Sequence, residues 1–326
     1  MLAVTVTEAA IQIGAHFRVT FQRTLRIPDD GGTYPLPPGL GALPVRRVAD
    51  FAEQTPADWR EHGGVFIPMY QREALWLNFT VPHWHPCAVK VAVGKINAIT
   101  GKDWTEQPAS DPQDYVVCPE QPWLDGINAG AGFIRQFVAM PLGQGYSVEG
   151  QITGKETFGG LQLLVFAPRP GRFPDEPPPV PHGLRETAMM MAPPAPVMTS
   201  AAMGLAAGGR MEQKIYPDEY GIATWDQKNS GQVYIHIVNS LAYQAITGEA
   251  PPPSPVSART YTEYGFPWFA LYDEAQGDLS PSDRLASVKS VKEMDQQKDL
   301  APQQDDNPVE VATTQIKTVG PKTPMV

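Results

Sequence analysis

The chain has 326 residues with a formal net charge of −10 at pH 7, and 42% of its residues are hydrophobic while 18% are charged. This composition is typical of a globular protein, although 35 prolines and 29 glycines indicate many loops and turns. Because nucleic acids and anionic membranes bind proteins through Lys and Arg, the negative charge argues against both as partners.

The cysteines and the N-terminus indicate the cellular compartment. Cys87 and Cys118 are too few for the disulfide framework of a secreted domain, so both are predicted to be free thiols. Residues 1–8 lack the basic start and apolar run of a signal peptide. No apolar run approaches the roughly 20 residues that cross a bilayer. We therefore expect a soluble cytoplasmic protein.

The first 167 residues have the pattern of short β-strands. Apolar and polar residues alternate over residues 2–6 and 17–27, which predicts half-buried strands. Further apolar runs follow, separated by Pro, Gly, Asn and Asp: residues 64–68, 74–80, 87–93, 115–118, 132–140 and 160–167. Short strands at this spacing predict a mainly antiparallel sandwich or barrel-like β domain over residues 1–167.

A linker rich in proline and methionine is predicted next, over residues 168–203. This stretch holds ten prolines and five methionines. Proline at that density prevents regular structure, whereas methionine packs adaptably on irregular surfaces. The linker is expected to lie over the body, and a Met-rich surface for a partner is the alternative.

Residues 204–275 are predicted to form a smaller mixed α/β segment packed on the first domain. Within it, Val233, Ile237, Leu241 and Ala245 lie at helical spacing, which favours a buried helix over residues 230–247. The first half of that stretch also fits a strand. Six aromatic residues between positions 261 and 272 are expected to dock on the body.

A disordered tail is predicted over residues 276–326. The segment contains no Phe, Trp or Tyr and is rich in Asp, Gln, Lys, Ser and Pro. Such a composition cannot bury enough apolar surface to offset chain entropy. Deletion of residues 277–326 is therefore expected to leave the melting temperature nearly unchanged.

One candidate metal site is His83, His85 and Cys87. Residues two apart in an extended chain project to the same face, so both imidazoles and the thiol could converge on one zinc ion. Cys118 could add a fourth ligand from a neighbouring strand. The alternative is a polar surface loop with an incidental thiol, because structural zinc sites usually pair two ligand knuckles. No other cofactor is expected.

Acidic and aromatic residues gather in the loops around residues 104–136. Trp104, Trp123 and Asp125 are candidate ligand-binding residues of a hydrolase or carbohydrate-binding protein, in which aromatic rings stack on sugar faces. The alternative is a structural turn at residues 121–126 in which Trp123 fills the core.

Several stretches resemble a family of uncharacterised bacterial proteins, namely residues 71–79, 89–101, 119–126, 134–141, 204–221 and 245–251. The resemblance covers most of residues 25–272. It implies no activity, ligand or catalytic residue, and only that the parts on the two sides of the linker form one unit.

The leading functional hypothesis is a non-enzymatic interaction or self-assembling structural protein. The sequence has neither a G-x-S-x-G elbow nor an H-E-x-x-H motif. An aromatic-rich β body and long adaptable segments suit contact with other chains. The expected partner is another protein or a second copy of this chain.

Overall fold

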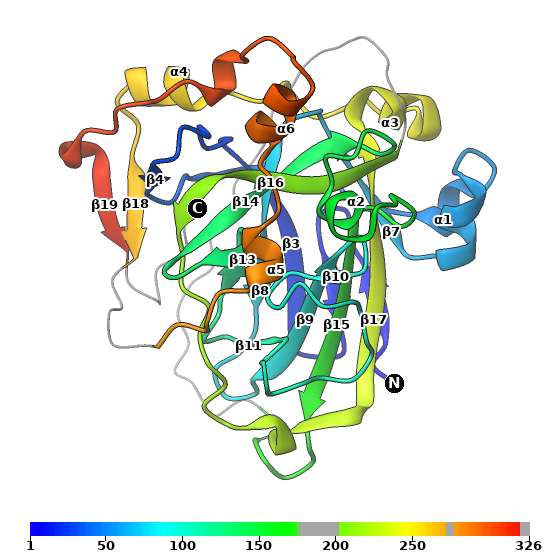
Figure 1. The fold of residues 1–326 in the computed structure, drawn as a ribbon. Helices are drawn as coiled ribbons and strands as arrows, with labels where there is room; N and C mark the ends of the chain where they lie inside the picture. The colour runs from blue at the N-terminus through cyan, green and yellow to red at the C-terminus, as the bar shows by residue number, and fades with distance from the viewer. Residues whose placement is uncertain (175, 177–201, 272–276, 320–326) are drawn as a thin grey trace.

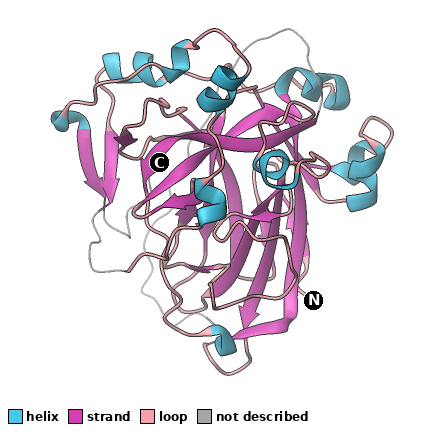
Figure 2. Ribbon diagram, viewed as in Figure 1, coloured by secondary structure: helices cyan, strands magenta, loops and turns pink. Residues whose placement is uncertain are grey.

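The computed structural model describes residues 1–174, 176, 202–271 and 277–319 (Figure 1). Most of the predicted linker, residues 168–203, therefore lies outside the described residues. Strands occupy the centre of the molecule and helices lie around its periphery (Figure 2).

In the described residues, 17 strands form one continuous and mainly antiparallel sheet, which confirms the predicted fold class. These strands are β1 (Val4–Val6), β2 (Ile11–Ile13), β3 (Phe17–Thr24), β4 (Thr33–Tyr34), β5 (Gly39–Ala42), β6 (Arg46–Arg47), β7 (Val65–Met69), β8 (Ala74–Thr80), β9 (Cys87–Val93), β10 (Ile96–Asn97), β11 (Val116–Cys118), β12 (Trp123–Leu124), β13 (Gly126–Gly130), β14 (Phe133–Pro141), β15 (Leu161–Pro168), β16 (Ala202–Glu212) and β17 (Trp225–Asn239). A second sheet pairs β18 (Trp268–Leu271) with β19 (Ile316–Val319) in parallel.

The helices are short and connect or cover the strands. They are α1 (Ala57–His62), α2 (Val148–Thr153), α3 (Ser240–Thr247), α4 (Ala258–Glu263), α5 (Asp283–Ala286) and α6 (Val291–Gln297). Single 3-10 turns are η1 (Val48–Phe51), η2 (Ile222–Thr224), η3 (Gln304–Asp306) and η4 (Thr313–Gln315).

The core forms where the long apolar strands pair with one another. In β15, Leu163 lies opposite Val91 of β9 on one side and Val233 of β17 on the other. All three side chains are buried, and they belong to one large apolar cluster. Alternating β-branched and leucine residues thus bring together strands that are far apart in the sequence.

The predicted helix over residues 230–247 is wrong in its first half, because β17 continues to Asn239 before α3 begins. Val233, Ile235 and Ile237 alternate along β17 and are buried. Period-two burial against β15 and β7 therefore overrides the helical spacing. The Asn239 side chain accepts a hydrogen bond from the Leu241 N–H and so caps α3.

Strands from both sides of the linker belong to the same sheet. β16 pairs with β14 and β17 pairs with β15, so the chain after the linker completes the sheet that the first 168 residues begin. The backbone N–H of Leu2 also donates to the Ser230 carbonyl, which attaches the first residues to β17.

The predicted disordered tail needs a correction over residues 277–319. This part of the chain forms α5, α6 and β19, and it covers β13 and β16 (Figure 1). Leu285, Val288 and Val291 are buried, and Ser290 forms a capping box with Glu293 at the start of α6. A few buried apolar residues are therefore enough to order this segment, although its overall composition is polar.

Ion pairs between buried and partly buried side chains also attach this segment to the sheet. The Arg72 guanidinium bonds Asp295 at 2.7 Å, Asp306 at 2.8 Å and Asp305 at 3.0 Å. Arg26 bonds Asp306 at 2.5 Å and also Asp305. We call these five residues the Arg–Asp network. Burial alone would raise the pKa of Asp305, but the bonds and charges of the two arginines lower it.

Replacing Arg26 by Ala is expected to lower the free energy of unfolding by about 3 kcal/mol, because buried carboxylates lose a charge partner. Urea unfolding followed by tryptophan fluorescence measures this change. Arg284→Ala is the control, because the Arg284–Asp103 pair has side chains that are 44% and 79% exposed. Such a pair contributes at most about 1 kcal/mol. Equal urea midpoints for the two variants would contradict the role of the network.

Candidate functional site

The structure separates the three predicted ligand-binding residues. Trp123 and Asp125 are only 6% and 2% exposed, and they lie in and next to β12 in the core. Gln213 donates from Nε2 to Asp125 Oδ2 at 2.7 Å, and Asp125 donates its backbone N–H to Gln213 Oε1 at 3.1 Å. This reciprocal pair ties β12 to the chain beyond β16. Trp104, in contrast, is half-buried and lies at a surface hollow.

Burial raises the pKa of Asp125 from 3.8 to about 7, although a hydrogen bond from Gln213 opposes the shift. The carboxyl group is a satisfied core group with no open access, since its residue is almost entirely inaccessible. Its unusual pKa therefore points to a cost for stability at neutral pH rather than to a role as an acid catalyst.

Trp104 lines a pocket of about 320 Å³, which we call the Trp104 pocket. Lys95, Asp103, Glu149, Lys155 and Phe158 also line it. Its walls come from the turn after β9, from the loop after β10 and from α2 with the loop that follows. Residues that are 50 positions apart in the sequence thus meet at one hollow, which the sequence pattern around residue 104 does not reveal.

Glu149 holds one wall of the Trp104 pocket. It is buried, and its carboxylate accepts backbone N–H bonds from Thr157 at 2.8 Å, Phe158 at 2.9 Å and Gly159 at 2.8 Å. These bonds occupy both carboxylate oxygens. Glu149 therefore shapes the loop over residues 157–159 and has little capacity left for a substrate proton.

The four candidate metal ligands do not meet as one set. Cys87 and Cys118 lie opposite each other in the β9–β11 pair, and both are buried free thiols. Burial raises the pKa of Cys118 well above its ordinary value, so it stays protonated. His83 is exposed, and His85 Nδ1 lies 2.8 Å from the Pro174 carbonyl oxygen.

Across the described residues, no group of three or more His, Cys, Asp and Glu side chains is arranged to hold a metal ion. The structure brings the two cysteines together without the two histidines. Deprotonated thiolates are the species that bind zinc, so the protonated Cys118 is a poor ligand.

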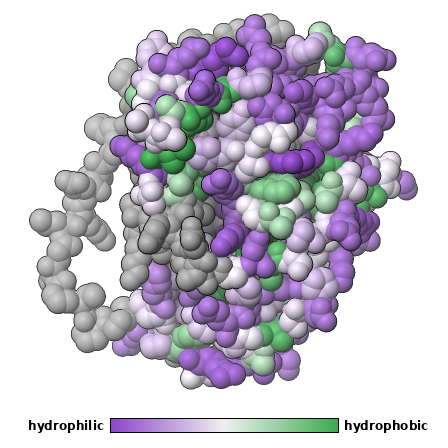
Figure 3. All heavy atoms as spheres, turned by 60° about the vertical axis from the view of Figure 1, so that its left-hand side comes forward, coloured by the Kyte–Doolittle hydropathy of each residue, from purple (hydrophilic) through white to green (hydrophobic). Residues whose placement is uncertain are grey.

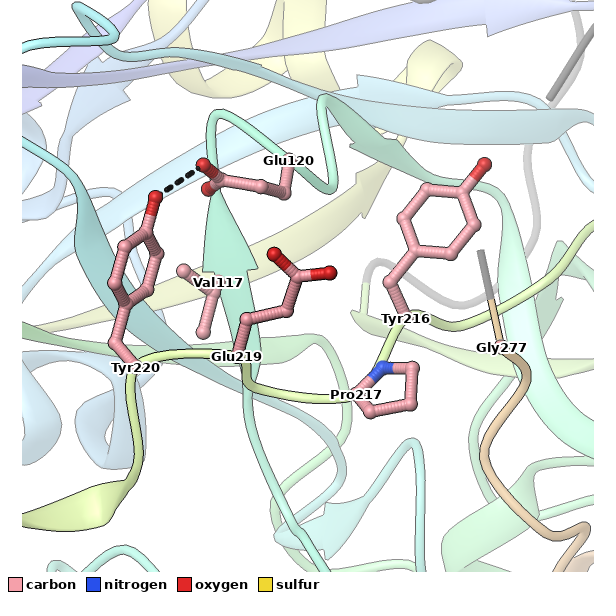
Figure 4. Close-up of a pocket in the computed structure, with 7 residues that line it drawn as sticks. All are labelled: Val117, Glu120, Tyr216, Pro217, Glu219, Tyr220 and Gly277. Carbon is pink, nitrogen blue, oxygen red and sulfur yellow. Dashed lines mark hydrogen bonds between the residues drawn. The ribbon is translucent and has the colours of Figure 1, made fainter. Parts of the chain in front are cut away.

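A second and smaller pocket of about 70 Å³ lies where the loop after β11 meets the chain after β16 (Figure 4). Tyr220 donates its hydroxyl to Glu120 Oε1 at 2.7 Å, and Val117 and Tyr216 form apolar walls. Because a single water needs at least about 10–15 Å³, the cavity has room for a few waters and not for a sugar ring. Sequence reasoning missed it, because Tyr220 and Glu120 are 100 positions apart.

Aromatic side chains remain exposed beside the second sheet. Trp268 docks on the body as expected and is fully buried, whereas Tyr264 is 75% exposed and Phe266 is 51% exposed. The Phe266 ring lies 5.1 Å from the ring of Tyr261. We call Tyr261, Tyr264 and Phe266, together with β18 and β19, the aromatic edge. Figure 3 turns this side forward and shows a small group of hydrophobic residues in its upper left part, surrounded by mostly hydrophilic ones.

Comparisons with known proteins leave the chain without an assigned family. No family model, curated protein or solved structure matches it. The resemblance to uncharacterised bacterial proteins thus rests on the quoted residues alone. Among the helices of the described residues, none has the length and apolar character needed to cross a bilayer.

Asp125→Asn is expected to change how stability depends on pH. The folded state keeps a proton on Asp125 up to a pH of about 7, whereas the unfolded state releases it near 3.8. Wild-type stability therefore falls relative to the variant as pH rises between these values, by on the order of 1.4 kcal/mol for each unit. Denaturant titrations over that range measure the difference.

Asp103→Asn is the matched control for this titration, because the Asp103 side chain is 79% exposed. It should follow the wild-type pH curve. If the Asp125→Asn and Asp103→Asn curves coincide, the buried carboxyl group is ionised throughout and the raised pKa is wrong.

Proposed function

We propose that this chain is a non-enzymatic interaction or self-assembling structural protein, and that the aromatic edge is its contact surface. The observation that carries the proposal is the exposure of Tyr264 and Phe266 side by side, with ring centroids 6.2 Å apart. Buried free thiols suit a reducing compartment, so we also propose a cytoplasmic location.

Exposed aromatic rings are energetically unusual on a protein that functions alone. Single exposed apolar residues are common, but aromatic residues that gather on a surface are typical of the centres of protein interfaces. Rings bury a large area on contact and lose little conformational entropy. Tyr264 and Phe266 would therefore be the anchors of such a contact.

The strand pair next to these rings supports the same conclusion. Two-stranded sheets are marginally stable alone, and parallel strands are usually covered on both faces. In the described part of the chain, β19 pairs only with β18. A strand from another chain could add to the outer side of β19, while its short length and Lys317 limit indiscriminate pairing.

The overall charge shapes how such a contact would behave. Each copy carries a net charge of −10, so two copies repel each other at long range. Apolar anchors at a localised surface overcome this repulsion at short range. Association should therefore strengthen as salt screens the repulsion.

The double variant Tyr264→Ser with Phe266→Ser is expected to weaken self-association, because it removes the apolar anchors without entering the core. Light scattering coupled to size-exclusion chromatography should show the mass of the variant moving toward the monomer value of 35.6 kDa at concentrations where the wild type is larger. Loss of both rings should weaken the contact by at least about tenfold.

Leu300→Ser is the matched control, because Leu300 is exposed to the same 51% as Phe266 but lies outside the aromatic edge. It should associate as the wild type does. The proposal fails if the wild type remains a monomer at high concentration and a pull-down finds no protein partner, or if the double variant behaves as the wild type.

A further inference from the structure

We propose that the Trp104 pocket binds an acidic monosaccharide, a sugar ring that carries one carboxylate. This inference is independent of the aromatic edge. It rests on the charge, the aromatic walls and the hydrogen-bonding capacity of the pocket.

The charge of the pocket favours an anion. Within the described residues, the ammonium groups of Lys95 and Lys155 take part in no ion pair, although acidic residues outnumber basic ones in the chain. Of the two acids that line the pocket, Glu149 accepts three backbone N–H bonds, and the exposed Asp103 lies 3.1 Å from Arg284. Two cations without carboxylate partners would gain most from one bound carboxylate.

The geometry around Lys95 is fixed before any ligand arrives. The backbone N–H of Lys95 donates to Gln162 Oε1 at 2.7 Å, and the backbone carbonyl of Lys95 accepts the backbone N–H of Trp104 at 2.8 Å. The Lys95 Nζ lies 4.1 Å from the centroid of the Phe158 ring. Backbone bonds therefore hold Lys95 next to Trp104, and the bond from the Phe158 N–H to Glu149 holds the other aromatic residue, which lowers the entropy cost of binding.

The aromatic residues favour a ring as the ligand. Trp104 and Phe158 line the pocket, and the C–H face of a pyranose stacks on such side chains. The ammonium groups of Lys95 and Lys155 are the donors of the pocket residues, which favours a ligand with acceptors such as carboxylate and hydroxyl oxygens.

The size and the engaged acids favour binding over hydrolysis. A volume of about 320 Å³ is at the lower end of small-molecule sites and suits a single sugar unit. Glycoside hydrolysis needs two free carboxyl groups on the two sides of the bond. Backbone N–H bonds occupy the Glu149 carboxylate, which leaves Asp103 as the one freely accessible carboxyl group among the pocket residues, so the pocket lacks that pair.

Titration of the full chain with glucuronate, glucose and adenosine monophosphate, followed by NMR shifts of the tryptophan indole N–H, tests the proposal. Glucuronate should bind, and glucose should bind at least about tenfold more weakly, because it lacks the carboxylate. Lys155→Gln should weaken glucuronate binding by a similar factor and leave the melting temperature unchanged. Trp104→Phe should weaken both sugars together, because the smaller ring offers less stacking area.

Lys102→Gln is the control, because Lys102 is exposed and close in sequence but does not line the pocket. It should bind glucuronate as the wild type does. Absence of glucuronate binding, equal binding of glucose, or tighter binding of the nucleotide would each overturn the proposal. Equal losses of glucuronate affinity in Lys102→Gln and Lys155→Gln would also overturn it, because they would show a general charge attraction rather than a specific site.

Discussion

The structure depends on two guanidinium groups, that of the buried Arg26 and that of the partly buried Arg72, and on the carboxylates that the end of the chain brings to them. Removing charges from water costs several kcal/mol for each ion, and only close pairing compensates for it. Arg72 reaches Asp295, Asp305 and Asp306, so one side chain joins α6 to η3. Its own backbone adopts φ of 70°, a conformation that favours glycine, and its N–H donates to the Ala139 carbonyl at 2.7 Å. The turn between β7 and β8 is thus held in a strained conformation in which its side chain meets the network.

This constraint connects the sheet to the proposed contact surface. The chain leaves the Arg–Asp network at η3 and then continues through η4 to β19, which pairs with β18 (Figure 1). Gln315 donates from Nε2 to the Thr262 carbonyl at 3.0 Å and so attaches the end of this segment to α4. The exposed rings of Tyr264 and Phe266 lie between α4 and β18. Their position on the surface therefore depends on a segment that is itself held by ion pairs to the sheet.

The fold class could be predicted from the sequence because the pattern of apolar residues that indicates β-strands is local. Alternation in β3 and short apolar runs in β8, β9 and β15 are local patterns, and they need no knowledge of partners. The errors arose where partners decide the outcome. Val233 and Ile237 fit both the helical and the strand periodicity, and their pairing with β15 and β7 decides for the strand. The polarity of residues 277–319 suggested disorder, because composition does not show that Asp305 and Asp306 meet two arginines more than 200 positions earlier. Likewise, Trp104 and Trp123 have similar sequence surroundings, yet one lines a pocket and the other fills the core.

The most direct test of this account is the melting temperature of the chain without residues 277–326. That truncation removes the three aspartates of the network together with the apolar residues of α5 and α6, and it leaves Arg26 and Arg72 without partners. The account predicts that the truncated chain melts at least about 5 °C below the full-length chain, or fails to fold, because several kcal/mol of stabilisation are lost. A truncated chain that melts within about 1 °C of the full-length protein would contradict it, and would show that the sheet is stable without the segment that covers it.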